Sequence, residues 1–303
     1  MSRAAFDNFF TDTARRHLVR AIRDALMEDG PDLTTNAVFT SDAELSATVI
    51  AKQDTLLAGV YIASMALEEC TTVEPGEWTC SCMAADGDRL SYGDVAATMQ
   101  GSARVILRAE RVMLNFITHL SGIANLTNRY VQALEGTGVR LLDTRKTLPG
   151  LRYPEKYAVL VGGGCNHRKN LSELLMLKDN HIDACGGILP AVERLRAAYG
   201  PALPIEVECR TLKEVEEAVL CGVSRIMLDN MLDGSGGDGG QQRMRQALEL
   251  VPPSIEVEVS GGVTLDAIGL VAGAGGTRKP DFVSVGGLTH SAPSADFSMK
   301  ISL

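Results

Sequence analysis

A basic segment between residues 143 and 181 carries the side chains best suited to chemistry. It contains seven Lys or Arg and four Asp or Glu, a formal charge of +3, within a chain whose net charge is −9. The rest of the chain therefore sums to −12, so positive charge is concentrated here. Fixed cations of this kind are the usual partners of carboxylates and phosphates. The simplest explanation is a small, highly charged anion held by Arg145, Lys146, His167, Arg168 and Lys178.

The elements that must position these residues alternate along the second half of the chain. Short apolar runs predict strands at 140–143, 174–178, 204–209, 225–229, 255–259 and 281–285. Helical spacing of apolar residues predicts helices near 187–198, 211–220, 241–250 and 264–272. This alternation predicts a parallel sheet with crossover helices. A sheet of about six strands could close as a small barrel or stay open, and periodicity does not decide between them.

Polar residues follow the C-terminal ends of these predicted strands, where parallel α/β barrels place their active sites. The first two ends supply cations, the next two supply Glu206, Glu208 and Asp229, and the last two supply glycine turns at 260–262 and 286–287. Such turns let backbone N–H groups approach a phosphate, and carboxylates beside a polyphosphate usually hold Mg²⁺. We therefore expect two ligands: a carboxylated anion, and a sugar with phosphate, pyrophosphate and a divalent metal.

Glu206 and Glu208 point to the same face of their predicted strand because side chains alternate along a strand. One of them could simply pair with Lys178 or Arg145. Lys178 itself ends the apolar run 174–177. Because burying a charge is costly, a Lys that emerges from such a run is expected to have a function.

The first half of the chain predicts a separate mixture of helices and strands. Leu18, Ile22 and Leu26 are spaced for a helix over 14–27, and a longer helix is expected over 110–134. Runs rich in Val, Ile, Ala and Leu predict strands at 46–51, 56–62 and 94–107. The glycine-rich segment 233–240 is expected to be a mobile insertion rather than a phosphate cradle, because no Lys-Ser/Thr pair follows it.

Composition excludes several classes of protein. Hydrophobic residues make up 45% and charged residues 22% of 303 residues, which is typical of a globular enzyme. No Lys/Arg-rich face suggests nucleic-acid binding, and no apolar run approaches the roughly 18 residues that span a bilayer. The first seven residues hold no apolar segment, so export is not expected. Seven cysteines without a paired framework favour structural thiols and a cytoplasmic location.

Ordered motifs cover nearly the whole chain and are densest over 108–182. They are Glu110-Arg111, Leu114-Asn115, Leu120-Ser121-Gly122-Ile123-Ala124, Asp143-Thr144-Arg145-Lys146-Thr147, Pro149-Gly150, Glu155-Lys156-Tyr157, Gly162-Gly163-Gly164, Asn166-His167-Arg168, Lys178-Asp179-Asn180-His181, Glu206-Val207-Glu208, Leu228-Asp229-Asn230, Ser260-Gly261-Gly262, Val285-Gly286 and Leu288-Thr289-His290-Ser291. In this order they resemble the quinolinate phosphoribosyltransferase family. The segments 28–35 and 233–240 match the family's pattern only loosely.

The resemblance implies an α/β protein with two domains. An N-terminal α/β sandwich domain would cover 1–110, and an incomplete C-terminal α/β barrel of about six parallel strands would cover 111–290. The helix 110–134 would connect them, and the tail 291–303 would pack back on the N-terminal domain. The family works as a homodimer or larger homo-oligomer, in which the N-terminal part of one subunit covers the barrel mouth of another.

The resemblance also implies a reaction of NAD biosynthesis. Quinolinate and phosphoribosyl pyrophosphate would react with Mg²⁺ to give nicotinate mononucleotide, CO₂ and pyrophosphate. By this resemblance Arg145, His167 and Arg168 hold the quinolinate carboxylates, with Arg111 reaching in from the partner subunit. Lys146 and Lys178 serve the anionic ligands, while Glu208 and Asp229 contact the ribose and the metal. The phosphate end would be lined by Ser260, Gly262, Gly286 and His290.

Three alternatives stay open at this point. The first is a related transferase that acts on nicotinate or another pyridine acid, although two carboxylate clamps favour the diacid. The second is a Schiff-base lyase that uses Lys178. The third is a binding or scaffold protein, which would not need so many charges at one barrel face.

Overall fold

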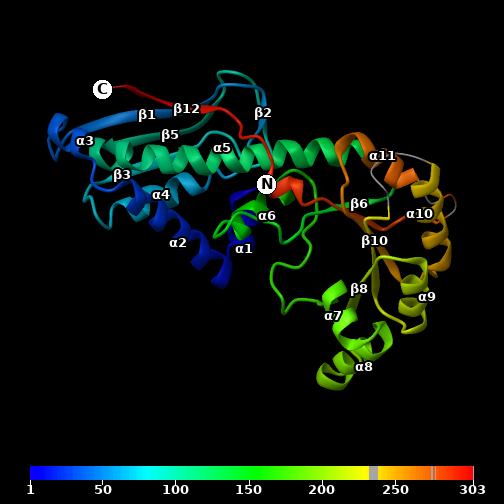
Figure 1. Ribbon diagram of the computed structural model, residues 1–303. Coiled ribbons are helices and arrows are strands. Elements are labelled where there is room, and N and C mark those ends of the chain that lie inside the picture. The colour runs from blue at the N-terminus through cyan, green and yellow to red at the C-terminus, as the bar shows by residue number, and fades with distance from the viewer. Residues whose placement is uncertain (232–237, 274–275, 277, 303) are drawn as a thin grey trace. The chain divides into compact units, whose positions relative to one another are not determined.

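The computed structural model describes residues 1–231, 238–273, 276 and 278–302 (Figure 1). Within the expected glycine-rich insertion, residues 233–237 lie outside the described residues. The chain forms two compact units, each built from separate segments. The first unit comprises 1–128, 146–163 and 287–303, and the second comprises 129–145 and 164–286. The domain boundaries expected from the sequence stay a prediction.

The first unit is built on an antiparallel sheet in the order β12-β1-β5-β3. Its strands are β1 (Glu44–Ala51), β3 (Trp78–Cys82), β5 (Val95–Ser102) and β12 (Phe297–Ser302), with a separate pair β2 (Thr55–Leu56) and β4 (Arg89–Leu90). Its helices are α1 (Arg3–Phe9), α2 (Asp12–Asp29), α3 (Leu33–Val38), α4 (Ile62–Cys70), α6 (Arg152–Val161), α12 (Gly287–His290) and most of α5 (Ala103–Ala133).

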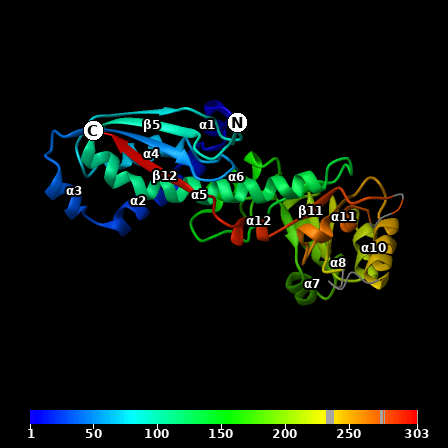
Figure 2. The same ribbon diagram turned by 90° about the horizontal axis from the view of Figure 1, so that it is seen from above.

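Amphipathic patterns explain how this unit packs. Along β1 every second residue from Leu45 to Ala51 is buried, so one face of the sheet meets the core. The long helix α5 lies beneath the sheet, and β12 extends the sheet beside β1 (Figures 1 and 2). In α2 the predicted stripe is confirmed, because Leu18, Ile22 and Leu26 are all buried.

The expected strand over 56–62 is wrong beyond Leu56. Gly59 has φ +90°, which turns the chain out of an extended conformation. The backbone at Ala58 bonds the Ser121 hydroxyl in both directions, with N–H donating at 2.9 Å and C=O accepting at 3.3 Å. These hydrogen bonds replace those of a neighbouring strand, and α4 begins at Ile62.

The expected strand over 94–107 ends at Ser102, where α5 takes over. The apolar composition of residues 103–107 favours a strand. Ile106 instead starts a helical stripe that continues through Ala109 and Met113, all fully buried. The helix therefore begins at Ala103, about two turns before the expected start at 110.

The second unit is a six-stranded parallel sheet in the order β6-β11-β10-β9-β8-β7. Its strands are β6 (Arg140–Leu142), β7 (Leu175–Leu177), β8 (Ile205–Cys209), β9 (Arg225–Asp229), β10 (Glu256–Ser260) and β11 (Phe282–Ser284). All six strands lie within the predicted ranges to a residue or two, and the α/β class with a six-stranded parallel sheet is confirmed. Strands β6 and β7 are the edges, so the hydrogen-bonded sheet stays open between them over the described chain.

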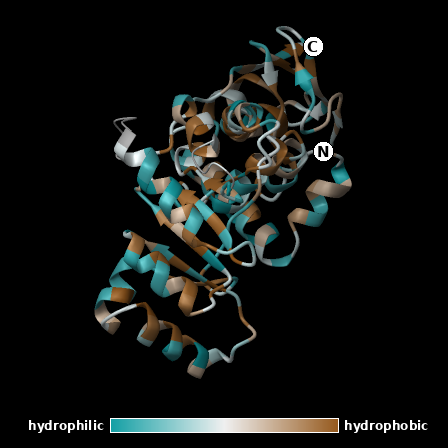
Figure 3. Cartoon of the chain, turned by 90° about the vertical axis from the view of Figure 1, so that its right-hand side faces the viewer, coloured by the Kyte–Doolittle hydropathy of each residue, from teal (hydrophilic) through white to brown (hydrophobic). Residues whose placement is uncertain are grey.

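Helices follow the strands of the second unit and lie outside them (Figure 1). They are α7 (Asp179–Cys185), α8 (Ile188–Tyr199), α9 (Leu212–Leu220), α10 (Asp238–Leu250) and α11 (Leu265–Gly273). Every residue of β8 is buried, including Glu206 and Glu208. Figure 3 shows hydrophilic residues on the strands as well as on the helices of this unit. One face of the sheet therefore carries polar groups into the interior, which an ordinary apolar core does not need.

Within the part of the chain that the structure describes, no helix combines enough length with enough apolar character to cross a membrane.

Candidate active site

The loop after β6 is fixed by one buried carboxylate. Asp143 is fully buried and accepts hydrogen bonds from the backbone N–H of His167 at 2.8 Å and from the Asn166 side chain at 2.7 Å. Leu142 and Cys165 also form an isolated parallel β-bridge. The segment that carries Arg168 is therefore joined to the end of β6, next to Arg145.

Arg145 and Arg168 are brought close together, as the sequence predicts. Both are half-buried, and Arg168 Nη1 donates to the carbonyl of Leu174 at 2.9 Å. Burial lowers the pKa of Arg168, and the neighbouring charge of Arg145 lowers it further. The Nε atom of Arg145 is buried and has no hydrogen-bond partner among the described residues. Two guanidiniums that repel each other in a partly buried place can be satisfied by an anion with two charged groups.

Two carboxylates follow on the neighbouring strands β8 and β9. Glu208 is buried and accepts a hydrogen bond from Lys178 Nζ at 2.7 Å, so of the two partners that the sequence left open for these glutamates, Lys178 pairs with Glu208. Asp229 is half-buried at the end of β9, and its Oδ2 accepts from the side-chain amide of Asn230 at 2.8 Å. Glu208 on β8 is aligned with Met227 on β9. Asp229 lies two residues beyond Met227, so it is on the same face of the sheet as Glu208 and nearer the carboxyl edge.

A glycine turn after β10 adjoins these carboxylates. Gly261 has φ +90°, and a Cβ there would lie 2.3 Å from the Asn230 side-chain oxygen, so only glycine fits. Ser260 pairs in register with Asp229 and accepts a hydrogen bond from the Ser284 hydroxyl at 3.0 Å. Gly262 and Gly286 follow the ends of β10 and β11 in the same unit. The backbone and hydroxyl groups expected at the phosphate end are therefore gathered at the carboxyl edge of the sheet.

Three of the predicted site residues belong to the first unit. Lys146 is exposed, and its backbone carbonyl accepts a hydrogen bond from the Thr289 hydroxyl at 2.8 Å. Thr289 directly precedes His290, which belongs to the same unit. Arg111 is exposed on α5. That Lys146, Arg111 and His290 contribute to an active site at the carboxyl ends of the strands stays a prediction.

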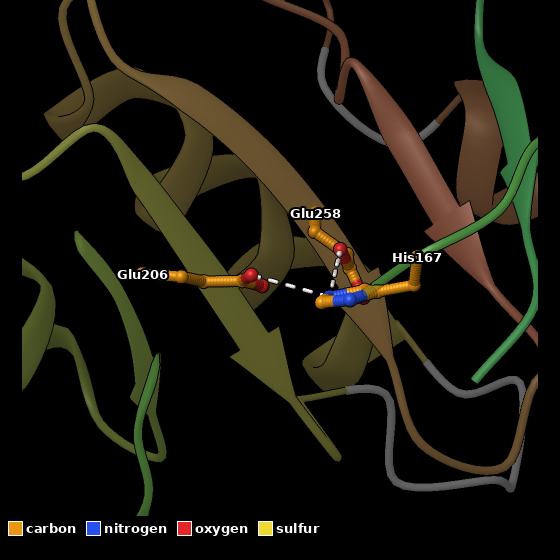
Figure 4. A group of neighbouring side chains, drawn as sticks. All are labelled: His167, Glu206 and Glu258. Carbon is orange, nitrogen blue, oxygen red and sulfur yellow. Dashed lines mark ion pairs between the residues drawn. The ribbon is translucent and has the colours of Figure 1, made fainter. Parts of the chain in front are cut away.

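A buried cluster inside the second unit was missed by the sequence analysis (Figure 4). His167 Nε2 lies 3.2 Å from Glu206 Oε2 and 3.4 Å from Glu258 Oε2, and both glutamates are completely buried. Arg225 Nη1 lies 3.5 Å from the same Glu258 oxygen and 4.0 Å from that of Glu206. The available signal was the repeat Glu-Val-Glu in β8 and β10, whose alternation places glutamates on the same face of the two strands that flank β9.

The ring of His167 is subject to opposing influences. Burial lowers its pKa, but the hydrogen bonds and charges of Glu206 and Glu258 outweigh burial and raise the pKa of His167 to about 9. The backbone N–H of Arg168 donates to Nδ1 at 2.7 Å. This contact opposes protonation of Nδ1, because a protonated ring nitrogen cannot accept a hydrogen bond.

Two family models match the chain over most of its length. The model described as the quinolinate phosphoribosyl transferase N-terminal domain matches residues 32–121, and the model of the C-terminal domain matches residues 123–300.

Curated relatives and solved structures agree with these matches. The chain is 39% identical to the probable nicotinate-nucleotide pyrophosphorylase (carboxylating) of Bacillus subtilis, over 90% of this chain and 88% of that protein. It is 37% identical to the nicotinate-nucleotide pyrophosphorylase (carboxylating) of Mycobacterium leprae, over 96% and 98% of the two chains. The crystal structure of NadC from Streptococcus pyogenes is 40% identical and superposes with a TM-score of 0.84, covering 96% of this chain and 99% of that one.

Proposed function

Because the chain belongs to the quinolinate phosphoribosyl transferase family, we propose that it joins quinolinate to phosphoribosyl pyrophosphate with loss of CO₂. The products would be nicotinate mononucleotide, CO₂ and pyrophosphate, a step of NAD biosynthesis. The observation that carries this proposal is the pair Arg145 and Arg168. Two half-buried, mutually repelling guanidiniums, in a unit whose strands β8 and β9 carry the carboxylates Glu208 and Asp229, suit a dianionic acid next to a phosphorylated sugar.

We assign the two carboxylates of quinolinate to Arg145 and Arg168. A guanidinium offers a planar fork of N–H groups that matches a carboxylate, and two such forks overcome the mutual repulsion of two carboxylates. The direct contact with quinolinate that the resemblance gives to His167 stays a prediction. Lys178, half-exposed and already paired with Glu208, is placed to share the anionic ligands.

The reaction needs no side-chain nucleophile. The lone pair of the pyridine nitrogen forms a bond to the anomeric carbon, and the bond from that carbon to pyrophosphate breaks with its electron pair leaving on the pyrophosphate. Positive charge develops on the sugar, where the carboxylates of Glu208 and Asp229 can stabilise it. The alkylated nitrogen then accepts electron density as the 2-carboxylate leaves as CO₂, and the ring carbon takes up a proton. Positioning and charge stabilisation therefore supply the rate.

The residues present suit the Mg²⁺ that the family implies. Glu208 and Asp229 present carboxylate oxygens from adjacent strands at the carboxyl edge of the sheet, the donor type that Mg²⁺ prefers. Two protein carboxylates leave room for substrate oxygens and water, as is usual for Mg²⁺ sites that serve phosphates. When bound, the ion would neutralise negative charge on the pyrophosphate.

The alternative of a Schiff-base lyase is disfavoured by the surroundings of Lys178. Such a lysine must lose its proton at neutral pH, which usually requires burial or a neighbouring cation. The side chain of Lys178 is 46% exposed and contacts the Glu208 carboxylate at 2.7 Å. Lys178 is therefore partly exposed and beside an anion, which are not the surroundings that a Schiff-base lysine needs.

Product analysis tests the proposed function. With quinolinate, phosphoribosyl pyrophosphate and Mg²⁺, we expect equal amounts of nicotinate mononucleotide, CO₂ and pyrophosphate. Nicotinate in place of quinolinate should give no CO₂ and little product. Turnover of nicotinate at a comparable rate would favour the related transferase, and no turnover of either acid would favour a binding protein.

We further infer that the active protein is a homodimer or larger homo-oligomer and that Arg111 serves the site of a partner subunit. Arg111 is exposed on α5, so its charge is accessible to a partner subunit. The Arg111→Ala and Lys178→Ala proteins should each be inactive. Random mixing of the two should restore about one quarter of the parent activity for a dimer, because half of the dimers then contain one intact site of two. No recovery in verified mixed dimers would contradict a shared site.

A further inference from the structure

The loop 146–151, which leads from Arg145 into α6, is not held by the core of its unit. Four of its six residues are exposed, namely 146 and 148–150. Residues 149–151 line a cavity of about 430 Å³, whose other walls belong to α2 and α5. A loop that is exposed and borders a cavity has few apolar contacts, so its position depends on its hydrogen bonds.

Side chains of α12 and α6 supply two of these hydrogen bonds. The Thr289 hydroxyl donates to the backbone carbonyl of Lys146 at 2.8 Å. The backbone N–H of Leu148 donates to Glu155 Oε2 at 3.1 Å. These two contacts hold the peptide groups on both sides of Thr147. They therefore fix the backbone from which the Lys146 side chain starts.

Glu155 requires an explanation because it is completely buried. Burying a carboxylate costs free energy unless its oxygens are satisfied. Oε2 accepts from Leu148, and Oε1 lies 2.9 Å from Nε2 of His119, a residue of α5 whose side chain is 21% exposed. Glu155 thus connects α5 to the loop. Apolar residues of similar volume fill a buried position without this cost, so a carboxylate placed there points to a role for its contacts.

We propose that Glu155 is a positioning residue for Lys146, which acts by holding the peptide group between Thr147 and Leu148. His119 contacts the second carboxylate oxygen and so holds the Glu155 side chain in place. A lysine that starts from a fixed backbone has less freedom to lose when it meets an anion. The inference rests on the proposed function and on the anion-binding part that the family resemblance gives to Lys146.

A purely structural role for Glu155 is the alternative. Glu155 lies in the first turn of α6, where a carboxylate stabilises a helix through the helix dipole. That role alone predicts a lower melting temperature and less active protein, with KM unchanged. A positioning role predicts a change in KM, so kinetics separate the two.

Glu155→Ala, alone and combined with Lys146→Ala, tests the proposal. Lys146→Ala first identifies the anionic substrate that Lys146 serves, as the one whose KM rises. For that substrate we expect Glu155→Ala to raise KM about 3- to 10-fold, as for the loss of one hydrogen bond, with kcat changed by less than about twofold. In the Lys146→Ala background the same change should raise KM by less than about twofold, because its target is gone.

Three kinetic outcomes would overturn the proposal. The first is a parent-like KM for both substrates in folded Glu155→Ala protein. The second is an unchanged KM for both substrates in Lys146→Ala, since a positioned Lys146 would then have nothing to bind. The third is an undiminished effect of Glu155→Ala in the double variant, which would show that Glu155 acts through another residue.

Three further variants serve as controls. Glu155→Gln keeps the length of the side chain and an acceptor for Leu148 N–H, so KM should stay within about twofold of the parent value. Glu155→Asp is one methylene shorter and should raise KM as Glu155→Ala does, which also covers the case in which Glu155→Ala fails to fold. Glu69→Ala removes a half-buried glutamate of α4 whose partner is Arg23 on α2, and it should keep the parent KM. A raised KM in Glu155→Gln with a parent-like KM in Glu155→Asp would contradict the proposal.

Hydrogen–deuterium exchange reads the loop directly and does not depend on turnover. Mass spectrometry of a peptide that spans 146–151 includes the amide of Leu148. We expect faster exchange of this peptide in Glu155→Ala, and parent-like exchange in Glu155→Gln and Glu69→Ala. Equal exchange in Glu155→Ala and the parent would overturn the proposal. The expected exchange in a parent protein that does not turn over quinolinate would contradict only the proposed function.

Discussion

Arg168→Ala and Arg145→Ala should each lose turnover of quinolinate while keeping the fold. Each change removes one half of the proposed clamp and leaves one carboxylate of the dianion without a partner. Removing one partner of a desolvated charge pair typically costs about 2 to 5 kcal/mol, so kcat/KM for quinolinate should fall by roughly 30- to several thousand-fold. The fold should survive, because both side chains are half-buried and their charges repel each other in the free protein.

Steady-state kinetics and circular dichroism measure the two parts of this prediction. Arg194→Ala is the matched control, since Arg194 is an exposed arginine on α8 whose guanidinium donates to Cys185 Sγ at 3.6 Å. The control should keep the parent kcat/KM. If Arg145→Ala or Arg168→Ala also kept it, the assignment of the carboxylate clamp would be wrong.

Glu208→Gln and Asp229→Asn should mainly lower kcat. The two carboxylates are assigned to the developing charge on the sugar and to Mg²⁺, and neither is assigned to quinolinate. Loss of one group that stabilises transition-state charge typically lowers kcat by about 10²- to 10³-fold. The Mg²⁺ concentration needed for half-maximal activity should rise as well, because a carboxamide is a weaker ligand than a carboxylate.

The binding of quinolinate should be nearly unchanged in both of these proteins. In Glu208→Gln the exposed ammonium of Lys178 loses its partner, but an exposed charge is satisfied by water. Glu193→Gln, at an exposed position on α8, provides a control for the loss of a carboxylate. A near-parent kcat at saturating Mg²⁺ in either Glu208→Gln or Asp229→Asn would remove that residue from the mechanism.

The parallel sheet could be predicted because its strands are short apolar runs with polar residues at one end. That pattern fixes both the strand positions and the edge at which Asp143, Lys178, Glu208 and Asp229 emerge. The first unit was harder to predict, because its signals conflict locally. Residues 103–107 are as apolar as a strand, and only their spacing relative to Met113 shows that the helix has already begun.

The buried cluster could not be predicted from spacing alone. Glu206 and Glu208 are two residues apart on one face of β8, yet one pairs with His167 and the other with Lys178. Which glutamate meets which cation depends on the register between β8, β9 and β10 and on the path of the loop that carries His167. Those are tertiary features, and no local pattern in the chain encodes them.

Binding of quinolinate and nicotinate, compared by isothermal titration calorimetry on the parent protein, tests the central claim most directly. The two acids share the pyridine ring and differ in the second carboxylate that the paired arginines are proposed to hold. We predict that quinolinate binds at least about tenfold more tightly than nicotinate, because a charge-assisted hydrogen bond to a guanidinium contributes at least about 1.5 kcal/mol. Equal affinities for the two acids would contradict the account.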